Sequence, residues 1–464
     1  MHRWVERIYE RSPVVLQHAM VSAYGWRLKQ LRYGGRHQKY LDELMRSQQY
    51  SEAELQELQA ENVRKLIQHC YENVPYYGQL LRQLKLTPGD FRSASDLARL
   101  PVLDKETVRQ QPELFYARNY RNAPCEVVST SGTTGTTLRI RVDVEGRRKN
   151  YAFFSRLKLW AGVSPFSRSA TWGGRVIVPA KARRPPFWRY NWAFNNLLFS
   201  SYHLSESNLP AYVAKLRSWK PEVIESYPSS IFVLARYIEE HQVELPSPRA
   251  IITSAETLLP HQREVVQSGL GTKIFDQYGA AEQICFVSQC EQGSYHVHPE
   301  FGVLESLPRA HAAGSDSRIV ATGFTNWAMP LLRYDTGDLA IAASRACACQ
   351  RNFPMLEQIL GRQDDFILTR DGRYVGRLDP VFKGLESIRK AQIVQETVDR
   401  LRIRVVPGEG FSPRDMDSVR HELQKRLGTE VECNFEVVDD IPLGPGGKFR
   451  AVISRVRSQS PRSE

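Results

Sequence analysis

Residues 129–136 (STSGTTGT) combine six hydroxyl side chains with two glycines in eight positions. Gly132 and Gly135 allow backbone N–H groups to approach an anion closely, and the hydroxyls can donate hydrogen bonds to phosphate oxygens. The Gly-Lys-Ser/Thr ending of a P-loop does not follow, so residues elsewhere must meet the charge of a bound phosphate. The segment predicts a phosphate-binding loop, with a Ser/Thr-rich linker as the alternative.

Further polar motifs follow this loop along the chain: 278–282 (YGAAE), 334–338 (YDTGD), 361–365 (GRQDD) and 442–448 (PLGPGGK). Each is weak alone, because a lone charged residue usually belongs to a solvated surface. In this order, the motifs resemble the adenylate-forming (acyl-activating) superfamily. The resemblance extends to its branch of phenylacetate-CoA ligases, coenzyme F390 synthetases and CapK-type proteins linked to surface polysaccharides. It covers nearly the whole chain, although Thr137 stands where many relatives have Pro.

The resemblance implies that ATP activates a carboxylic acid to an acyl-adenylate with release of pyrophosphate. Because two anions must meet, charge stabilisation and positioning dominate this chemistry. Glu282 would bind Mg²⁺, Asp338 would accept both ribose hydroxyls, and the catalytic Lys448 would reach the α-phosphate and the substrate carboxylate. The β- and γ-phosphates would be held by the loop residues Thr130, Ser131, Gly132, Thr133, Thr134 and Gly135.

The same resemblance assigns the rest of the site. Arg362 would add positive charge to the ATP site and, with Asp364, would lie at the hinge of a rotating small domain. His203, as a catalytic residue, and Tyr227, as a substrate contact, match positions near the acid in relatives; a packed core residue is the alternative for both. Adenine would be flanked by Ser254, Ala255, Glu256, Tyr278 and Gly279.

A second group of residues has the chemistry of a metal site. Cys290 and His296 are followed by the pair Cys347 and Cys349, and three thiolates with one imidazole would complete a tetrahedral structural zinc site. The spacing fits no common zinc finger. Reduced, partly buried thiols are the alternative, and Cys285 is a competing ligand.

The elements that must position these residues change along the chain. Residues 1–85 read as mostly helical, and 126–345 alternate β-branched runs with helical stretches, which indicates a largely parallel α/β core. After Gly361 the pattern is α+β, with a helix expected over 413–427. The predicted fold is therefore α/β, with a large adenylate-forming domain of mixed sheets and helices and a small mobile α+β C-terminal domain. The predicted divisions are 1–85 packed on the main domain, 86–363, 364–455 and a disordered tail 456–464.

Composition limits the compartment and the partners. The chain has 464 residues and a net charge of +12, and residues 1–40 carry eight Lys and Arg against two Glu, half of the surplus. This basic, aromatic segment predicts either a helix packed on the main domain or a peripheral contact with an anionic membrane. Seven scattered cysteines and the lack of a long apolar run favour a cytoplasmic protein, with a peripheral position at the inner membrane face as the further option. No nucleic-acid partner is expected, because no DNA- or RNA-binding signature accompanies the charge.

These features predict a ligase that uses ATP and Mg²⁺ to adenylate a small-molecule carboxylic acid. The acyl group would pass to coenzyme A, as the ligase branch implies. Transfer to an amine or a sugar acceptor in surface polysaccharide biosynthesis is the alternative that the CapK likeness implies. A catalytically silent membrane-surface binding module is the remaining alternative.

Overall fold

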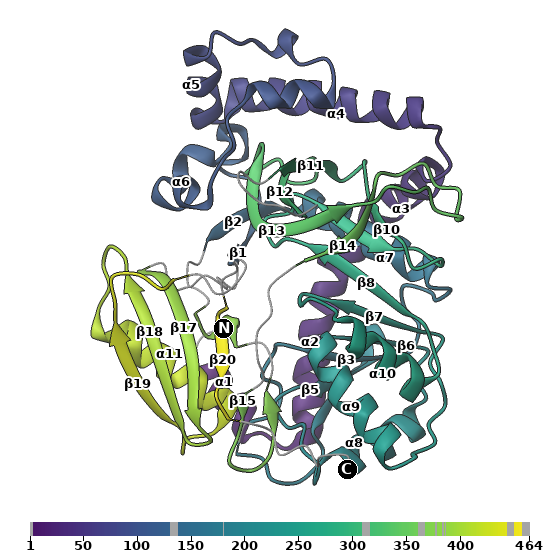
Figure 1. Ribbon diagram of the computed structural model, residues 1–464, viewed down its shortest axis with the longest axis vertical. Coiled ribbons are helices and arrows are strands. Elements are labelled where there is room, and N and C mark those ends of the chain that lie inside the picture. The colour runs from purple at the N-terminus through teal and green to yellow at the C-terminus, as the bar shows by residue number, and fades with distance from the viewer. Residues whose placement is uncertain are drawn as a thin grey trace.

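The computed structural model describes residues 3–129, 138–179, 181–308, 316–360, 367–375, 378–382, 385, 387–442 and 450–456. Its centre is a 12-stranded sheet with the strand order β11-β12-β13-β14-β10-β9-β8-β7-β6-β3-β5-β4 (Figure 1). The strands are β3 (Ser169–Gly173), β4 (Trp188–Asn191), β5 (Asn196–Ser200), β6 (Val223–Ser226), β7 (Ala250–Ser254), β8 (Ile274–Gly279), β9 (Phe286–Gln289), β10 (Tyr295–Val297), β11 (Gly302–Pro308), β12 (Asp316–Gly323), β13 (Tyr334–Ala342) and β14 (Met355–Ile359).

The sheet is parallel in one half and antiparallel in the other. β5, β3, β6, β7 and β8 are parallel neighbours, whereas β8, β9, β10, β14, β13, β12 and β11 pair antiparallel in that order. The α/β class is confirmed, but the expectation of a largely parallel core is wrong beyond β8. The cause is that the described connections from β12 to β13 and from β13 to β14 contain no crossover helix, which a parallel pair requires.

Helices cover both faces of the parallel half. Ile251 packs into a core with α8 (Leu209–Trp219), α9 (Pro228–Glu240) and α10 (Pro260–Leu270). The next residue, Ile252, packs into a separate core with α3 (His37–Ser47) and α7 (Val144–Trp160). Successive strand residues point to opposite faces, so a strand covered on both sides must be apolar throughout. This explains the continuous run Ala250–Ile252 and the buried position of β7.

The N-terminal region is helical: α1 (Arg3–Arg11), α2 (Val14–Tyr33), α3, α4 (Glu52–Asn73), α5 (Pro75–Gln83) and the short α6 (Lys105–Gln110). α4 begins at a capping box in which Ser51 and Glu54 satisfy each other's backbone N–H groups, and Pro75 starts α5 because it cannot continue α4. In Figure 1, α4 and α5 lie at the top of the molecule, beyond β11 and β12.

α2 packs on the edge of the main sheet. The hydroxyl of Ser22 donates to the carbonyl of Tyr190 (3.3 Å) and accepts from the amide of Trp192 (3.0 Å). Its basic residues also contact the protein, since the Lys29 Nζ lies 4.6 Å from the ring centroid of Phe166. These are the contacts of a helix packed on the main domain.

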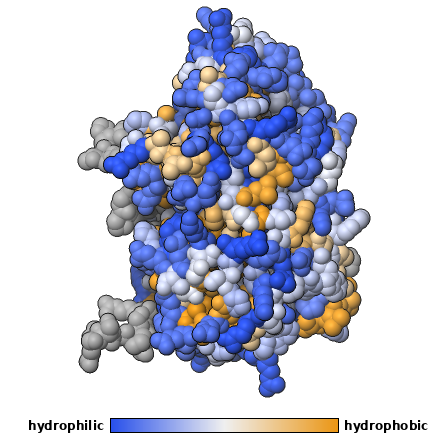
Figure 2. All heavy atoms as spheres, turned by 90° about the vertical axis from the view of Figure 1, so that its right-hand side faces the viewer, coloured by the Kyte–Doolittle hydropathy of each residue, from blue (hydrophilic) through white to orange (hydrophobic). Residues whose placement is uncertain are grey.

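An apolar part of α2 nevertheless faces solvent. Val15 is 74% exposed, Leu16 50% and Trp26 63%. The face of the molecule in Figure 2 is mostly hydrophilic, with separate hydrophobic patches. Among the described residues, no helix is long and apolar enough to cross a membrane.

A small α+β unit follows residue 366. Its four-stranded sheet has the order β19-β18-β17-β20, from β17 (Ile388–Thr397), β18 (Arg400–Pro407), β19 (Glu432–Val437) and β20 (Val452–Ser454), with α11 (Pro413–Leu427) packed on it. A short hairpin of β15 (Ile367–Leu368) and β16 (Tyr374–Val375) precedes it. Arg373 joins the unit to the main domain, because its guanidinium donates to the carbonyls of Tyr202, Arg426 and Leu427.

Candidate active site

The carboxyl ends of four parallel strands lie at one edge of the main sheet. The register pairs Trp172 of β3 with Ser226 of β6, Ser226 with Thr253 of β7, and Ser254 with Gln277 of β8. Segments that leave this edge therefore lie side by side. Ligands of open α/β sheets bind outside the carboxyl ends of the strands, so this edge is the candidate site.

Tyr278, at the end of β8, reaches across to Asp338 on β13. Its hydroxyl donates to Oδ2 of Asp338 at 2.9 Å. Burial, with the Asp338 carboxylate adding to it, raises the pKa of Tyr278 well above its usual value, so the hydroxyl stays protonated and remains a donor. Asp338 is itself oriented by its backbone N–H, which donates to the Thr336 hydroxyl at 3.1 Å, after a turn at Gly337 with φ +73°.

Glu282 follows Tyr278 by four residues and has its own tyrosine partner. The hydroxyl of Tyr334, the first residue of β13, donates to Oε1 of Glu282 at 3.3 Å. Tyr334 is 2% exposed, and its backbone bridges to Leu103. Glu282 is only partly buried, so a carboxylate oxygen can face a hard cation such as Mg²⁺ at this edge.

The loop after β7 is held by a helix N-terminus. Ala255 adopts a left-handed conformation with φ +72°, which is rare for a residue with a Cβ. The Glu256 carboxylate accepts hydrogen bonds from the backbone N–H (2.9 Å) and the hydroxyl (3.0 Å) of Ser229, in the first turn of α9. The helix dipole favours a negative charge there, so Glu256 anchors the loop that carries Ser254 and Ala255.

His203 has a fully enclosed ring. It is 1% exposed, its Nδ1 lies 2.7 Å from the Ser200 hydroxyl, and its Nε2 lies 3.2 Å from the carbonyl of Pro179. Burial, with Arg373 nearby, lowers its pKa to about 3, so the ring is neutral at pH 7. Both nitrogens have protein partners, and these surroundings match the alternative of a packed core histidine.

Tyr227 stands at the sheet edge, before α9. Its hydroxyl accepts a hydrogen bond from the backbone N–H of Gly174 at 2.9 Å, and Tyr202 donates to the carbonyl of the same glycine at 2.9 Å. A Cβ at Gly174 would lie 2.7 Å from the Tyr227 hydroxyl, so the close approach requires glycine. Tyr227 thereby borders the same edge as Ser254 and Tyr278.

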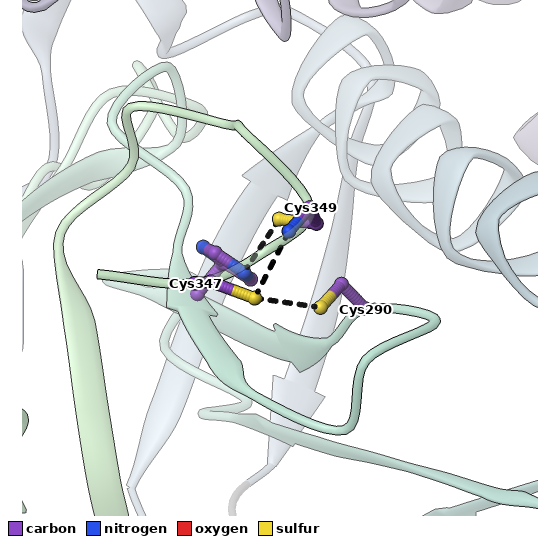
Figure 3. Close-up of side chains that lie close together, drawn as sticks. Cys290, Cys347 and Cys349 are labelled. Atoms are coloured by element: carbon purple, nitrogen blue, oxygen red, sulfur yellow. Dashed lines mark hydrogen bonds between the residues drawn. The ribbon is translucent and has the colours of Figure 1, made fainter. Parts of the chain in front are cut away.

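The four predicted metal ligands lie close together at the hairpin of β9 and β10. Cys290 follows β9, His296 lies in β10, and Cys347 and Cys349 lie in the connection from β13 to β14; their ligand atoms are all within 4.8 Å of one another. Figure 3 shows the three sulfur atoms turned toward one another. Cys285 is buried in a different core and is not part of this cluster.

The amino-acid sequence is similar to two known proteins over most of its length. The chain is 28% identical over 456 residues to the protein CapK of Staphylococcus aureus. The aligned region covers 97% of this chain and 99% of CapK. It is 29% identical over 453 residues to the phenylacetate-coenzyme A ligase of Thermus thermophilus, covering 86% of this chain and 96% of the ligase. The chain therefore resembles CapK and the phenylacetate-coenzyme A ligases over most of its length.

Two further similarities concern the C-terminal unit and the fold. Residues 367–455 of the CapK-like chain match the family of the CapK C-terminal domain. A solved structure of 2-hydroxyisobutyryl-CoA ligase in the postadenylation state has a similar fold, with a TM-score of 0.54, 20% identity and coverage of 88% of this chain and 90% of that one. That similarity concerns the fold.

Part of the predicted site of the CapK-like chain lies outside the described residues. Ser129 of β1 (Cys125–Ser129) pairs with Arg139 of β2 (Arg139–Asp143), so the segment predicted to bind phosphate lies in the sequence between these two antiparallel strands. The positions outside the described residues are Thr130, Ser131, Gly132, Thr133, Thr134, Gly135, Arg362, Asp364 and Lys448.

Two residues at the edge were not singled out from the sequence. Tyr334 orients Glu282, and Gly174 lets Tyr202 and Tyr227 approach one backbone segment. Tyr334 opens the 334–338 motif, and Gly174 ends a Gly-Gly pair directly after a β run. A glycine at a strand often marks a close backbone approach, so the sequence carried a weak signal at Gly174.

Proposed function

We propose that this protein activates a carboxylic acid with ATP and then transfers the acyl group to a nucleophile. A substrate carboxylate oxygen attacks the α-phosphorus, the bond between the α-phosphorus and the bridging oxygen of pyrophosphate breaks, and pyrophosphate leaves. The acceptor then attacks the acyl carbon, and AMP leaves. The observation that supports the proposal is the hydrogen bond of Tyr278 to Asp338, because it joins two of the motifs predicted to bind the nucleotide, and Tyr278 ends a strand at the candidate edge of the sheet.

Each residue has one task in this proposal. Asp338 accepts the ribose hydroxyls, with Tyr278 holding its carboxylate in place. Glu282, oriented by Tyr334, offers the hard oxygen ligand that Mg²⁺ prefers. Mg²⁺ would neutralise charge on the phosphates.

Residues outside the described part of the chain complete the proposed site. Residues Thr130 to Gly135 bind the terminal phosphates, and Lys448 supplies the cation at the α-phosphate. Arg362 and Asp364 serve the hinge.

Coenzyme A is the proposed acceptor, because several curated relatives are named phenylacetate-coenzyme A ligase. The likeness to CapK over almost its whole length supports the second candidate, an amine or sugar acceptor in polysaccharide biosynthesis. A screen of aryl, acyl and amino acids for pyrophosphate release, with and without coenzyme A, distinguishes the two. Thioester formation supports the first, and amide or ester formation on an added acceptor supports the second.

Replacement of the proposed catalytic lysine tests the activity itself. Pyrophosphate release should require a cognate acid, and Lys448→Ala should lower the adenylation rate about 100-fold or more, because one preorganised charge is removed from the reacting phosphate. Lys390→Ala is the matched control, since Lys390 lies in the same unit and its ammonium pairs with Asp440. An undiminished rate in Lys448→Ala would refute its role, and no release with any acid would favour a silent binding module.

We also propose a peripheral contact of residues 1–40 with the inner face of an anionic membrane. The exposed side chains Val15, Leu16 and Trp26 lie on a segment with a net positive charge, and apolar insertion together with basic attraction is how such helices bind. Because α2 also packs on β4, point changes are a cleaner test than truncation.

Vesicle binding tests this contact. The full chain should sediment with vesicles containing phosphatidylglycerol and not with phosphatidylcholine vesicles, and the double variant Leu16→Ser/Trp26→Ser should lose most of this binding. Val437→Ser, which changes an exposed apolar residue of β19, is the control. Equal sedimentation of the double variant would remove the proposal.

A further inference from the structure

We propose that Cys290, His296, Cys347 and Cys349 bind one structural Zn²⁺ ion. This proposal does not depend on the proposed enzymatic activity. It rests on the convergence of four soft ligand atoms from two chain segments that are 57 residues apart at Cys290 and Cys347.

The ligand atoms have the separations of a tetrahedral site. Cys290 Sγ and Cys347 Sγ are 3.6 Å apart, and Cys349 Sγ lies 3.3 Å from Nε2 of His296. With zinc–sulfur bonds of about 2.3 Å and zinc–nitrogen bonds of about 2.0 Å, tetrahedral geometry places two sulfurs about 3.8 Å apart and sulfur and nitrogen about 3.5 Å apart. Small movements of the ligand atoms would therefore bring their separations to those of a tetrahedral zinc site.

Backbone N–H groups donate to two of the three sulfurs. The N–H of Gln292 donates to Cys290 Sγ at 3.3 Å, and the N–H of Cys349 donates to Cys347 Sγ at 3.5 Å. A negative sulfur accepts such bonds better than a thiol does, and zinc is bound by thiolates. The turn that presents Cys290 is closed by Gly293 at φ +81°.

The cluster is enclosed on its inner side. Cys290 is 1% exposed and His296 is buried completely, and the apolar rings of Trp160 and Phe353 pack beside them. Four protein ligands leave no open position for water or substrate, so the site is structural rather than catalytic.

The donor set favours zinc over the other common divalent metals. The distance between Cys290 and Cys347 argues against a disulfide between them. Three thiolates and an imidazole suit zinc, whereas Mg²⁺ and Ca²⁺ require oxygen ligands. The sulfurs of Cys290 and Cys347 stand 3.6 Å apart, well beyond a disulfide bond of about 2.05 Å, and both cysteines are free.

The ion would connect two parts of the sheet that carry the nucleotide motifs. Cys290 and His296 lie in the β9–β10 hairpin, which follows β8 and Tyr278, whereas Cys347 and Cys349 follow β13 and Asp338. An ion pair of Arg351 with Glu291 (2.9 Å) spans the same two segments. The zinc would therefore hold these two parts of the sheet together and so support the hydrogen bond between Tyr278 and Asp338.

Metal analysis of the full chain tests the proposal. Protein purified without added zinc should contain about one zinc per chain, and the Cys347→Ser/Cys349→Ser variant should fall to about a tenth of that. Cys125→Ser, which changes a half-buried cysteine of β1, is the matched control and should keep its zinc. Zinc-free wild-type protein, or full zinc content in the double variant, overturns the proposal.

A second measurement covers the case in which the double variant does not fold. Wild-type chain expressed with Co²⁺ should show intense thiolate-to-metal charge-transfer absorption and the visible bands of tetrahedral cobalt. A spectrum of octahedral cobalt without thiolate bands contradicts the ligand set. Both readouts are independent of catalysis, so failure of the proposed function leaves them unaffected.

Discussion

Tyr278 and Asp338 are 60 positions apart in the chain, and the tyrosine hydroxyl donates to Oδ2 of the aspartate at 2.9 Å. The two residues come from different halves of the main sheet: β8 is its last parallel strand, and β13 lies in the antiparallel half. The contact orients the carboxylate that we assign to the ribose.

Tyr278→Phe should weaken ATP use without unfolding the protein. Losing a hydrogen bond to a charged group costs about 1.5–3 kcal/mol, which corresponds to a fall in kcat/KM for ATP of about 10- to 150-fold. Steady-state pyrophosphate release measures it. Tyr40→Phe, on α3, removes a similar bond to Glu145 of α7 (2.8 Å) and should leave kcat/KM unchanged; equal losses in both variants would contradict the assignment.

Glu282→Gln should raise the Mg²⁺ concentration needed for half-maximal activity, because a neutral amide replaces the charged oxygen ligand. Tyr334→Phe should cause a smaller rise, about 10-fold or less, since it removes only the orienting hydroxyl at 3.3 Å. Magnesium titrations at saturating ATP measure both effects. Unchanged magnesium dependence in Glu282→Gln would exclude this carboxylate from the metal site.

Glu300→Gln should destabilise the protein strongly. Glu300 accepts hydrogen bonds of 2.6 and 3.1 Å from Arg156, whose side chain is 0% exposed. Removing one partner of a buried pair leaves an uncompensated charge and costs about 3–5 kcal/mol of unfolding free energy. Urea unfolding measures the loss, and Glu57→Gln, in the exposed pair with Arg64, should cost less than about 1 kcal/mol.

His203→Gln should flatten the acid side of the stability profile. The pKa of His203 is about 3 in the folded chain, against an ordinary 6.5, so the unfolded chain binds more protons between these values. The histidine's contribution is therefore present above pH 6.5 and is lost as the pH falls toward 3, at up to about 1.4 kcal/mol per pH unit. Urea unfolding at pH 7, 6 and 5 should show a smaller slope in the variant.

A packing control separates protonation from lost contacts at His203. Phe187 stacks on the ring at a centroid distance of 5.2 Å, and Phe187→Leu should lower stability by a similar amount at every pH. A pH slope that His203→Gln leaves unchanged would show that the ring is charged in the folded protein.

Local signals in the sequence predicted several elements well. α11 runs over residues 413–427 as expected, because Ser412 with Asp415 caps its start and Gly428 follows its end. The β-branched runs of β6 and β7 were recognised for the same reason, since their propensity is carried by adjacent residues. Ordered motifs likewise identified the adenylate-forming fold.

The direction of the strands and the state of single side chains depend on distant residues. The antiparallel half was missed because pairing of β12 with β13 is decided by tertiary contacts, not by either strand alone. His203 has the residue type of a catalytic group, yet only the packed chain encloses both of its ring nitrogens. Glu256 is a second example, because only the folded chain brings its carboxylate to the backbone N–H of Ser229 in the first turn of α9.

The sequence by itself determined which chemistry the chain can offer: the carboxylates, the hydroxyl-rich segment, three cysteines and a histidine are visible as residue types in order. Only the tertiary structure decided which of them meet. Tyr278 contacts Asp338, and Cys290 lies beside Cys347, because the strand order of one sheet brings their segments together. Strand order is set by burial and backbone pairing summed over the whole domain, and no short segment of sequence carries that information.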